Sequence, residues 1–290
     1  MFTFRYHAIS LIAVFLALGI GVLVGVSIGE EGVVSGASKD LENSLRGDLR
    51  EARGRTSDLR AELRIRDAFE RQAYPGLVGD LLPGFRIGIV AMGDLPGSYS
   101  GLIRDAVEPA SADIASISVI RAPLPLDRLA KDLRGTSFAK VERSSDDLAR
   151  LGERLGKQLA NGGGLVERVK GSLFSSSRGE YRGLDGIVWV RDREGLKGDE
   201  KQAQDRFETS MLAGMRSTDA EIVGVETRDA DPSQIPFMTR HGLATVDDID
   251  LVAGRAALVY ALLGAAGQYG VKQTAGQLLP PPAIERAGTR

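Results

Sequence analysis

The sequence predicts an α/β protein that carries a transmembrane helix and a coiled-coil-like helical stalk ahead of its body. Three observations indicate this: an uncharged apolar run near the start, a charged stretch with regularly spaced leucines, and alternating β-rich and amphipathic helical segments. The predicted parts are a head at 1–7, a span at 8–29, a stalk at 38–73, a body at 84–277 and a disordered tail at 278–290.

The predicted membrane span runs from Ala8 to Gly29 and reads AISLIAVFLALGIGVLVGVSIG, without a charge. About 20 apolar residues in a helix cross a hydrocarbon core roughly 30 Å thick. A cleaved export signal has a shorter apolar region ending at small residues. The one candidate for such a site, Ser35-Gly36-Ala37, lies beyond Glu30 and Glu31. We therefore expect an uncleaved anchor, with a cleaved signal as the alternative.

The orientation of this span rests on its flanks. Arg5 precedes it, and Lys39 and Arg46 follow it, so the number of nearby positive charges does not decide the topology. The short head and the acidic pair after the span favour a cytoplasmic head. We expect a single-pass protein of the cell membrane with an extracytoplasmic body.

Gly21 and Gly25 form a G-x-x-x-G spacing within the span. That spacing lets two membrane helices approach closely, although chance placement in a glycine-rich span explains it equally well.

The overall composition fits a folded body and excludes several classes of site. Hydrophobic residues make up 43% of the chain and charged residues 26%, which is ordinary for a globular protein. The net charge of −2 argues against a nucleic-acid partner. Because the chain has no cysteine, a disulfide framework, a zinc ribbon and a thiol nucleophile are excluded.

The predicted stalk has apolar or small residues separated by alternating steps of four and three. They are Leu45, Leu49, Ala52, Thr56, Leu59 and Leu63. This is the spacing of a coiled-coil seam, with Ser38 as the expected N-cap and Tyr74-Pro75-Gly76 as the expected end. Two interpretations stay open: self-association or pairing with an envelope protein through this seam, or packing of a single amphipathic helix on its own body.

The body alternates between strands and helices, which predicts a mostly parallel, Rossmann-like or flavodoxin-like sheet. Strands are expected at 85–93, 112–122, 185–192 and 220–228, and helices at 100–108, 144–164, 198–217 and 253–266. The helix at 144–164 has Ser144 or Ser145 as its cap and glycines beyond its end. In such sheets ligands bind at the carboxyl ends of the strands.

The sequence offers little for catalysis. The glycine-rich VAMGDLPGSYSG follows neither the dinucleotide nor the P-loop pattern, and a plain turn explains it better than a nucleotide site. The two histidines are His7, at the membrane edge, and His241, for which a surface loop is the simpler explanation. We therefore expect a protein that is not an enzyme and has no certain cofactor.

The densest acidic cluster comprises Asp247, Asp248 and Asp250 in TVDDIDLVAGRAALVYALLGAAGQYG. Carboxylate oxygens bind Ca²⁺ or Mg²⁺, and an unrecognised metal-dependent enzyme is one hypothesis for this motif. The simpler interpretation is that these acids cap the helix that follows and that Arg255 pairs with one of them.

Two segments resemble the actinobacterial copper transport protein family, MctB: the opening RYHAISLIAVFLALGIGVLVG and the late TVDDIDLVAGRAALVYALLGAAGQYG. The middle of the chain resembles it in architecture alone. The resemblance implies an outward-facing envelope protein with a role in copper efflux or homeostasis, in a family described as outer-membrane channel proteins. It also implies a possible role in envelope assembly and cell separation with a membrane partner.

The residues themselves give this copper role little support. Copper favours Cys, Met and His, and a transmembrane barrel needs many alternating segments where this chain has one apolar helix. The candidate ligands are Met211 and Met215, four apart on one helix, and Met238 and His241, three apart in an expected loop. Core packing explains the paired methionines more simply. Copper is thus a possible ligand by resemblance only, and an anchored interaction module is the alternative function.

Overall fold

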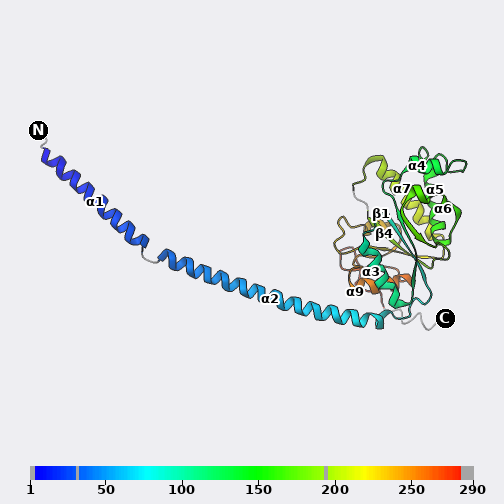
Figure 1. Ribbon diagram of the computed structural model, residues 1–290, viewed down its shortest axis with the longest axis horizontal. Coiled ribbons are helices and arrows are strands. Elements are labelled where there is room, and N and C mark those ends of the chain that lie inside the picture. Colours follow the sequence, from blue (N-terminus) through cyan, green and yellow to red (C-terminus); the bar gives the residue numbers. More distant parts are fainter. Residues whose placement is uncertain (1–3, 31–32, 193–194, 282–290) are drawn as a thin grey trace. The chain divides into compact units, whose positions relative to one another are not determined.

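The computed structural model describes residues 4–30, 33–192 and 195–281. The chain forms two compact units, Met1–Ala68 and Phe69–Arg290 (Figure 1). The head at 1–7 and the tail at 278–290 lie partly outside the described residues.

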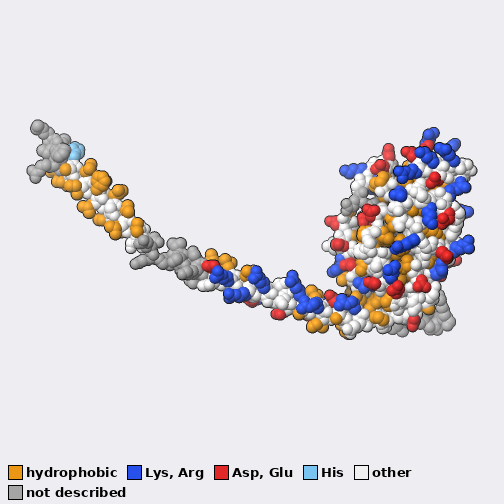
Figure 2. All heavy atoms as spheres, viewed as in Figure 1, with side chains coloured by type: hydrophobic (Ala, Val, Ile, Leu, Met, Phe, Trp, Pro, Cys, Tyr) orange, Lys and Arg blue, Asp and Glu red, His pale blue; other side chains and the backbone are white. Residues whose placement is uncertain are grey.

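The first helix, α1, spans Phe4–Glu30 and contains the predicted anchor. Its apolar part, Tyr6–Ser27, has a mean hydropathy of 2.8, and none of it is buried within the protein. Figure 2 shows this surface as almost uninterrupted hydrophobic side chains. The helix is therefore long and apolar enough to cross a membrane.

The second helix, α2, spans Val33–Val78 and is longer at both ends than predicted. Ser38 is not its N-cap, because nothing in the preceding residues interrupts the helix and each added residue gains a hydrogen bond. Pro75 does not end it either. Tyr74 and Val78 on either side of Pro75 are buried in the body, and the Tyr74 hydroxyl donates to the Ala106 carbonyl at 2.8 Å. This burial offsets the hydrogen bond that proline cannot make.

The leucines of the stalk seam are exposed in the single chain. Leu45 is 58% exposed and Leu63 is 50% exposed. Pairing of this seam with another helix stays a prediction.

The body is built on a seven-stranded sheet in the order β3-β2-β1-β4-β5-β6-β7. The strands are β1 (Arg86–Gly93), β2 (Asp113–Ile120), β3 (Phe174–Gly179), β4 (Gly186–Asp192), β5 (Glu221–Val225), β6 (Ala244–Val246) and β7 (Gln268–Tyr269). All neighbours pair in parallel except β2 and β3, which are antiparallel. The five strands β2-β1-β4-β5-β6 follow the flavodoxin-like order, which confirms the predicted fold class.

Helices cover both faces of this sheet, as Figure 1 shows. They are α3 (Gly97–Val107), α4 (Leu126–Asp132), α5 (Ser145–Asn161), α6 (Gly164–Leu173), α7 (Gly198–Arg216), α8 (Ile235–Arg240) and α9 (Val252–Leu262), with a short 3-10 turn at Glu108–Ala110. Strand β4 shows why both faces are covered: Trp189 enters one core with α5 and α7, and Val188 and Val190 enter the other with α3 and α9. A strand buried on both faces reads as an unbroken apolar run.

Helix α5 begins as its sequence predicts. The Ser144 side chain accepts a hydrogen bond from the Asp147 amide, and Gly162, with φ of +80°, follows the last turn. The shorter elements β3, β6, β7, α4, α6 and α8 were not predicted. Strand β3 reads FSSSRG, which has no apolar alternation, and β6 and β7 have three and two residues. Such short segments carry too little periodicity to be recognised.

Helices α5 and α7 approach through glycines. A Cβ on Gly152 would lie 2.7 Å from the Phe207 carbonyl oxygen, and one on Gly156 would overlap the Met211 carbonyl oxygen. Because main-chain atoms stand opposite, the contact cannot adjust by moving a side chain.

We expect Gly156→Ala to destabilise the protein by about 3 kcal/mol, because the new methyl group overpacks the α5–α7 contact. Urea unfolding followed by circular dichroism measures this loss. The matched control is Gly171→Ala in α6, where no atom lies within 4 Å of the added Cβ. It should leave stability unchanged or raise it by roughly 0.5 kcal/mol. Equal effects of the two substitutions would contradict the close-packing explanation.

Candidate functional site at the carboxyl edge of the sheet

Several buried polar side chains lie at the carboxyl ends of β4, β5 and β6, among them Arg191, Glu226 and Asp247. Helix α3 leaves β1 toward one face of the sheet, and α7 leaves β4 toward the other. This is the switch point where open α/β sheets form a ligand crevice. A cavity of about 310 Å³ lies there, lined among others by Tyr99, Arg191, Thr227 and Asp229.

One wall of this crevice is a chain of hydroxyl groups. The Thr227 hydroxyl donates to the Asp229 carboxylate at 2.5 Å, and the Tyr99 hydroxyl, 3.3 Å away, donates to Thr227. The Thr227 amide in turn donates to the Tyr99 oxygen at 3.2 Å. Burial raises the pKa of Tyr99, and the hydrogen bond from Thr227 lowers the pKa of Asp229. The wall is therefore anionic, which does not suit a phosphate group.

Arg191 forms the buried floor, with its side chain 7% exposed. Its Nε donates to Glu208 at 2.6 Å, one terminal nitrogen donates to Asp205 at 3.0 Å and the other to Gln234. The guanidinium carbon also lies 3.8 Å from the centre of the Phe237 ring. Such a buried, multiply bonded arginine holds β4, α7 and α8 together.

Two acids at the ends of β5 and β6 hold the segment that follows β7. Asp247 accepts the amides of Val271, at 2.8 Å, and Lys272. Glu226 accepts the Lys272 ammonium at 2.6 Å. Gly270 has φ of +136°, and a Cβ there would overlap the Asp247 carboxylate. Asp247 therefore requires both a glycine and two free amides in this segment.

Asp250 binds the loop after β5. Its carboxylate accepts the Arg228 amide at 3.0 Å and the Arg228 Nε at 2.7 Å. The expected pairing of Asp250 or its neighbours with Arg255 is not what the structure has. Arg255 donates to the Asp250 carbonyl oxygen at 3.4 Å instead.

The expected helix-capping role of these acids is also wrong. The N-cap of α9 is Leu251, and no side chain makes a capping hydrogen bond there. The acids bind segments that are remote in the sequence, which the local pattern alone did not reveal.

Asp248 differs from its neighbours because it is fully buried and neither carboxylate oxygen has a hydrogen-bond partner in the described part of the chain. The pKa of Asp248 is raised to about 7, first by burial and then by the charges of Asp247 and Asp250, while Arg228 lowers it by less. Asp247 and Asp250 accept hydrogen bonds from nearby donors, whereas Asp248 has none among the described residues and carries a proton below neutral pH.

The candidate copper ligands have other contacts in the structure. Met211, Met215 and Met238 are all fully buried in the core, and the Met238 sulfur lies against Gly224. The His241 ring instead packs on Phe237, with centroids 4.5 Å apart.

His241 also lies in an electropositive region. Its pKa is lowered by burial and then by Arg240, Arg191 and Arg216. Positive surroundings disfavour a bound cation. Among the described residues, no group of three or more His, Cys, Asp or Glu side chains is placed to hold a metal ion.

Sequence reasoning found the three aspartates but missed their partners. Glu226, Arg228 and Lys272 complete the network, and Arg191 and Tyr99 line the crevice. The sequence signal that could have identified two of these residues is their place at the ends of predicted strands. Arg191 is the second-last residue of β4, and Glu226 directly follows β5.

We expect Asp248→Asn to gain stability over the natural protein as the pH rises. The carboxyl has a pKa of about 7 in the folded state against 3.8 when unfolded. Its contribution to stability is therefore fully present below pH 3.8 and is lost as the pH rises through 7. The total difference is on the order of 4 kcal/mol.

Urea unfolding of both proteins at several pH values measures this difference. The control is Asp229→Asn, an exposed acid with a lowered pKa, which should lose stability relative to the natural protein as the pH rises. A pH-independent difference between Asp248→Asn and the natural protein would show that Asp248 does not titrate in this range.

Comparison with known proteins extends the resemblance over nearly the whole chain. The family model described as "Copper transport outer membrane protein, MctB" matches residues 1–280. Comparison with curated proteins finds no match. Because the family match includes the apolar helix, the stalk and the complete sheet, this chain belongs to the MctB copper transport outer membrane protein family.

Proposed function

We propose that this protein is a single-pass, non-enzymatic component of the cell envelope that contributes to copper transport and homeostasis through contacts with other proteins. The observation that carries the proposal is α1, whose apolar stretch Tyr6–Ser27 is entirely exposed. The copper role comes from the family to which the chain belongs.

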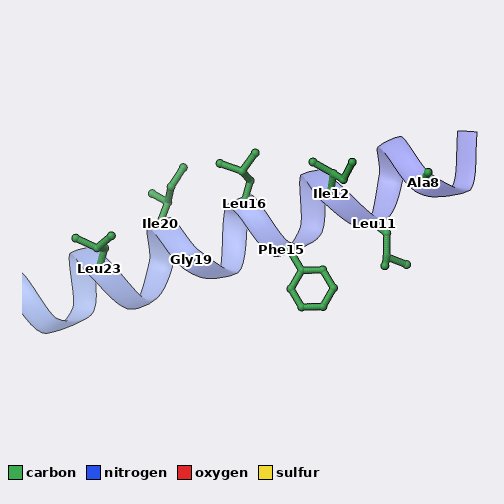
Figure 3. A pocket seen from close by; sticks show the side chains of 8 residues that line it. All are labelled: Ala8, Leu11, Ile12, Phe15, Leu16, Gly19, Ile20 and Leu23. Atoms are coloured by element: carbon green, nitrogen blue, oxygen red, sulfur yellow. The ribbon is translucent and has the colours of Figure 1, made fainter. Parts of the chain in front are cut away.

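The side chains of α1 support a lipid environment. Figure 3 shows Ile12, Leu16 and Ile20 projecting to one side of the helix and Leu11 and Phe15 to another. The hollow between these side chains is a surface of one helix, lined entirely by apolar residues and glycine. In water this surface would be costly to expose, whereas lipid covers it without loss. The short head before the span and Glu30-Glu31 after it support an extracytoplasmic body.

The proposed indirect role in copper handling is supported by the contacts that the methionines and carboxylates of the body already make. Its buried methionines fill the core, and Asp247, Asp250 and Glu226 are occupied by amides, Arg228 and Lys272. These groups would have to give up packing or hydrogen bonds to bind copper. A protein that recruits or positions a transport partner needs no such exchange.

A reporter fused to the carboxyl end tests the orientation. Alkaline phosphatase, which folds outside the cytoplasm, should be active, and a fluorescent protein that folds only inside should be dark. Amino-terminal sequencing of the mature protein should begin at or near Met1. A mature chain that begins after Ala37 would contradict the anchor.

Copper tolerance of cells tests the indirect role. In a strain that lacks the gene, the natural chain and a variant carrying Met211→Leu, Met215→Leu, Met238→Leu and His241→Gln should restore tolerance equally. Leucine preserves the packing of methionine, so the body should stay folded. A chain lacking residues 4–30 should not restore tolerance. A folded four-substitution variant that leaves cells copper-sensitive would indicate direct copper binding.

A further inference from the structure

The stalk carries an apolar seam whose leucines are exposed. Its seam positions between residues 45 and 63 of α2 are exposed, among them Leu49 at 50% and Leu59 at 61%. In heptad notation Leu45 and Leu59 occupy d positions and Leu49 and Leu63 occupy a positions. Ala52 and Thr56 fill the central layers.

The two flanks of this seam carry opposite charge. The e and b positions on one flank hold Arg46, Arg50, Arg53, Arg60 and Arg64. The g and c positions on the other flank hold Asp48, Glu51, Asp58 and Glu62, with Arg55 as the exception. The rear f positions hold Gly47, Gly54 and Ala61. Figure 2 shows these charged side chains along α2.

This charge division makes the helix complementary to itself in one orientation. In a parallel pair, the e flank of each helix faces the g flank of the other, so that a basic flank meets a flank that is acidic except at Arg55. In an antiparallel pair, e faces e and g faces g, so that like charges meet. From this pattern we infer that the stalk forms a parallel, in-register coiled coil with a second copy of the same chain.

In this register one of the three g-to-e contacts is attractive and two join like charges. Asp48 of one copy would face Arg53 of the other, an attractive pair. Arg55 and Glu62 would each face a residue of like charge, but both are already paired within their own helix. Arg55 bonds to Glu51 at 2.5 Å, and Arg66 lies 3.5 Å from Glu62.

The inference rests on the proposed anchoring, because two chains anchored at the same end in one membrane can meet only in parallel. The seam is short, and its centre is an Ala and a Thr layer, so pairing of free stalks would be weak. Confinement to a membrane raises the effective concentration of the second copy and favours pairing.

Cysteine crosslinking of the full-length chain in membranes tests the pairing. The natural chain has no cysteine, so an introduced one is the sole thiol. Leu45→Cys and Leu59→Cys should each give mainly disulfide-linked dimers with diamide as oxidant, because facing d positions come within disulfide distance. Ala61→Cys on the rear of the helix is the matched control and should stay mainly monomeric.

A charge exchange gives a second readout. In the Leu59→Cys chain, Arg53→Glu should lower the dimer yield several-fold, and adding Asp48→Arg should restore it. Ala61→Glu should leave the yield unchanged. Asp48, Arg53 and Leu59 are exposed and Ala61 is half-buried, and all four lie in the stalk, so a change in yield does not reflect unfolding of the body.

The outcomes separate this inference from the proposed function. A chain that stays in the membrane and supports copper tolerance, yet crosslinks equally weakly at all three positions, would overturn the pairing alone. Disulfides formed only between Leu45→Cys and Leu63→Cys chains, or with a different protein, would also overturn it. A chain missing from the membrane fraction would overturn the anchoring and the pairing together.

Discussion

The body depends on one constraint: its central strands are buried on both faces. Strands β1, β4 and β5 lie in the middle of the sheet, and their side chains alternate between two cores. Double burial leaves water access to these strands only at their ends. Polar side chains therefore gather at the carboxyl edge, and each one that is buried there needs a partner from elsewhere in the chain.

That need explains the acidic motif of this chain. Asp247, Asp250 and Glu226 fasten two remote segments, the loop after β5 and the residues after β7, to the edge of the sheet. Here the acids act as structural acceptors, and their charges are matched by Arg228 and Lys272. Asp248 is the exception, since it is buried among them without a donor and holds a proton instead. In this structure, the motif that marks the family resemblance thus mainly supplies acceptors that hold two remote segments at the edge of the sheet.

The amino-terminal unit differs from the body because its large apolar side chains are exposed. Both α1 and the stalk part of α2 expose large apolar side chains: α1 all around its surface, and the stalk along one seam. An unbroken apolar surface suits lipid, and a narrow seam with divided charges suits another helix. These surfaces agree with the proposal of an anchored protein that works through its contacts.

The sequence by itself determined the elements whose signals are local. The span was evident from its uncharged length, helix α5 from Ser144 and its glycine stop, and the parallel sheet from alternating strands and helices. Tertiary structure alone decided what depends on distant residues. It carried α2 through Pro75 by burying Tyr74 and Val78, and it gave Asp247 and Asp250 their partners. It also placed Met238 in the core and packed the His241 ring on Phe237. The physical reason is that periodicity and capping act within a few residues, whereas burial and buried hydrogen bonds join residues that the fold brings together.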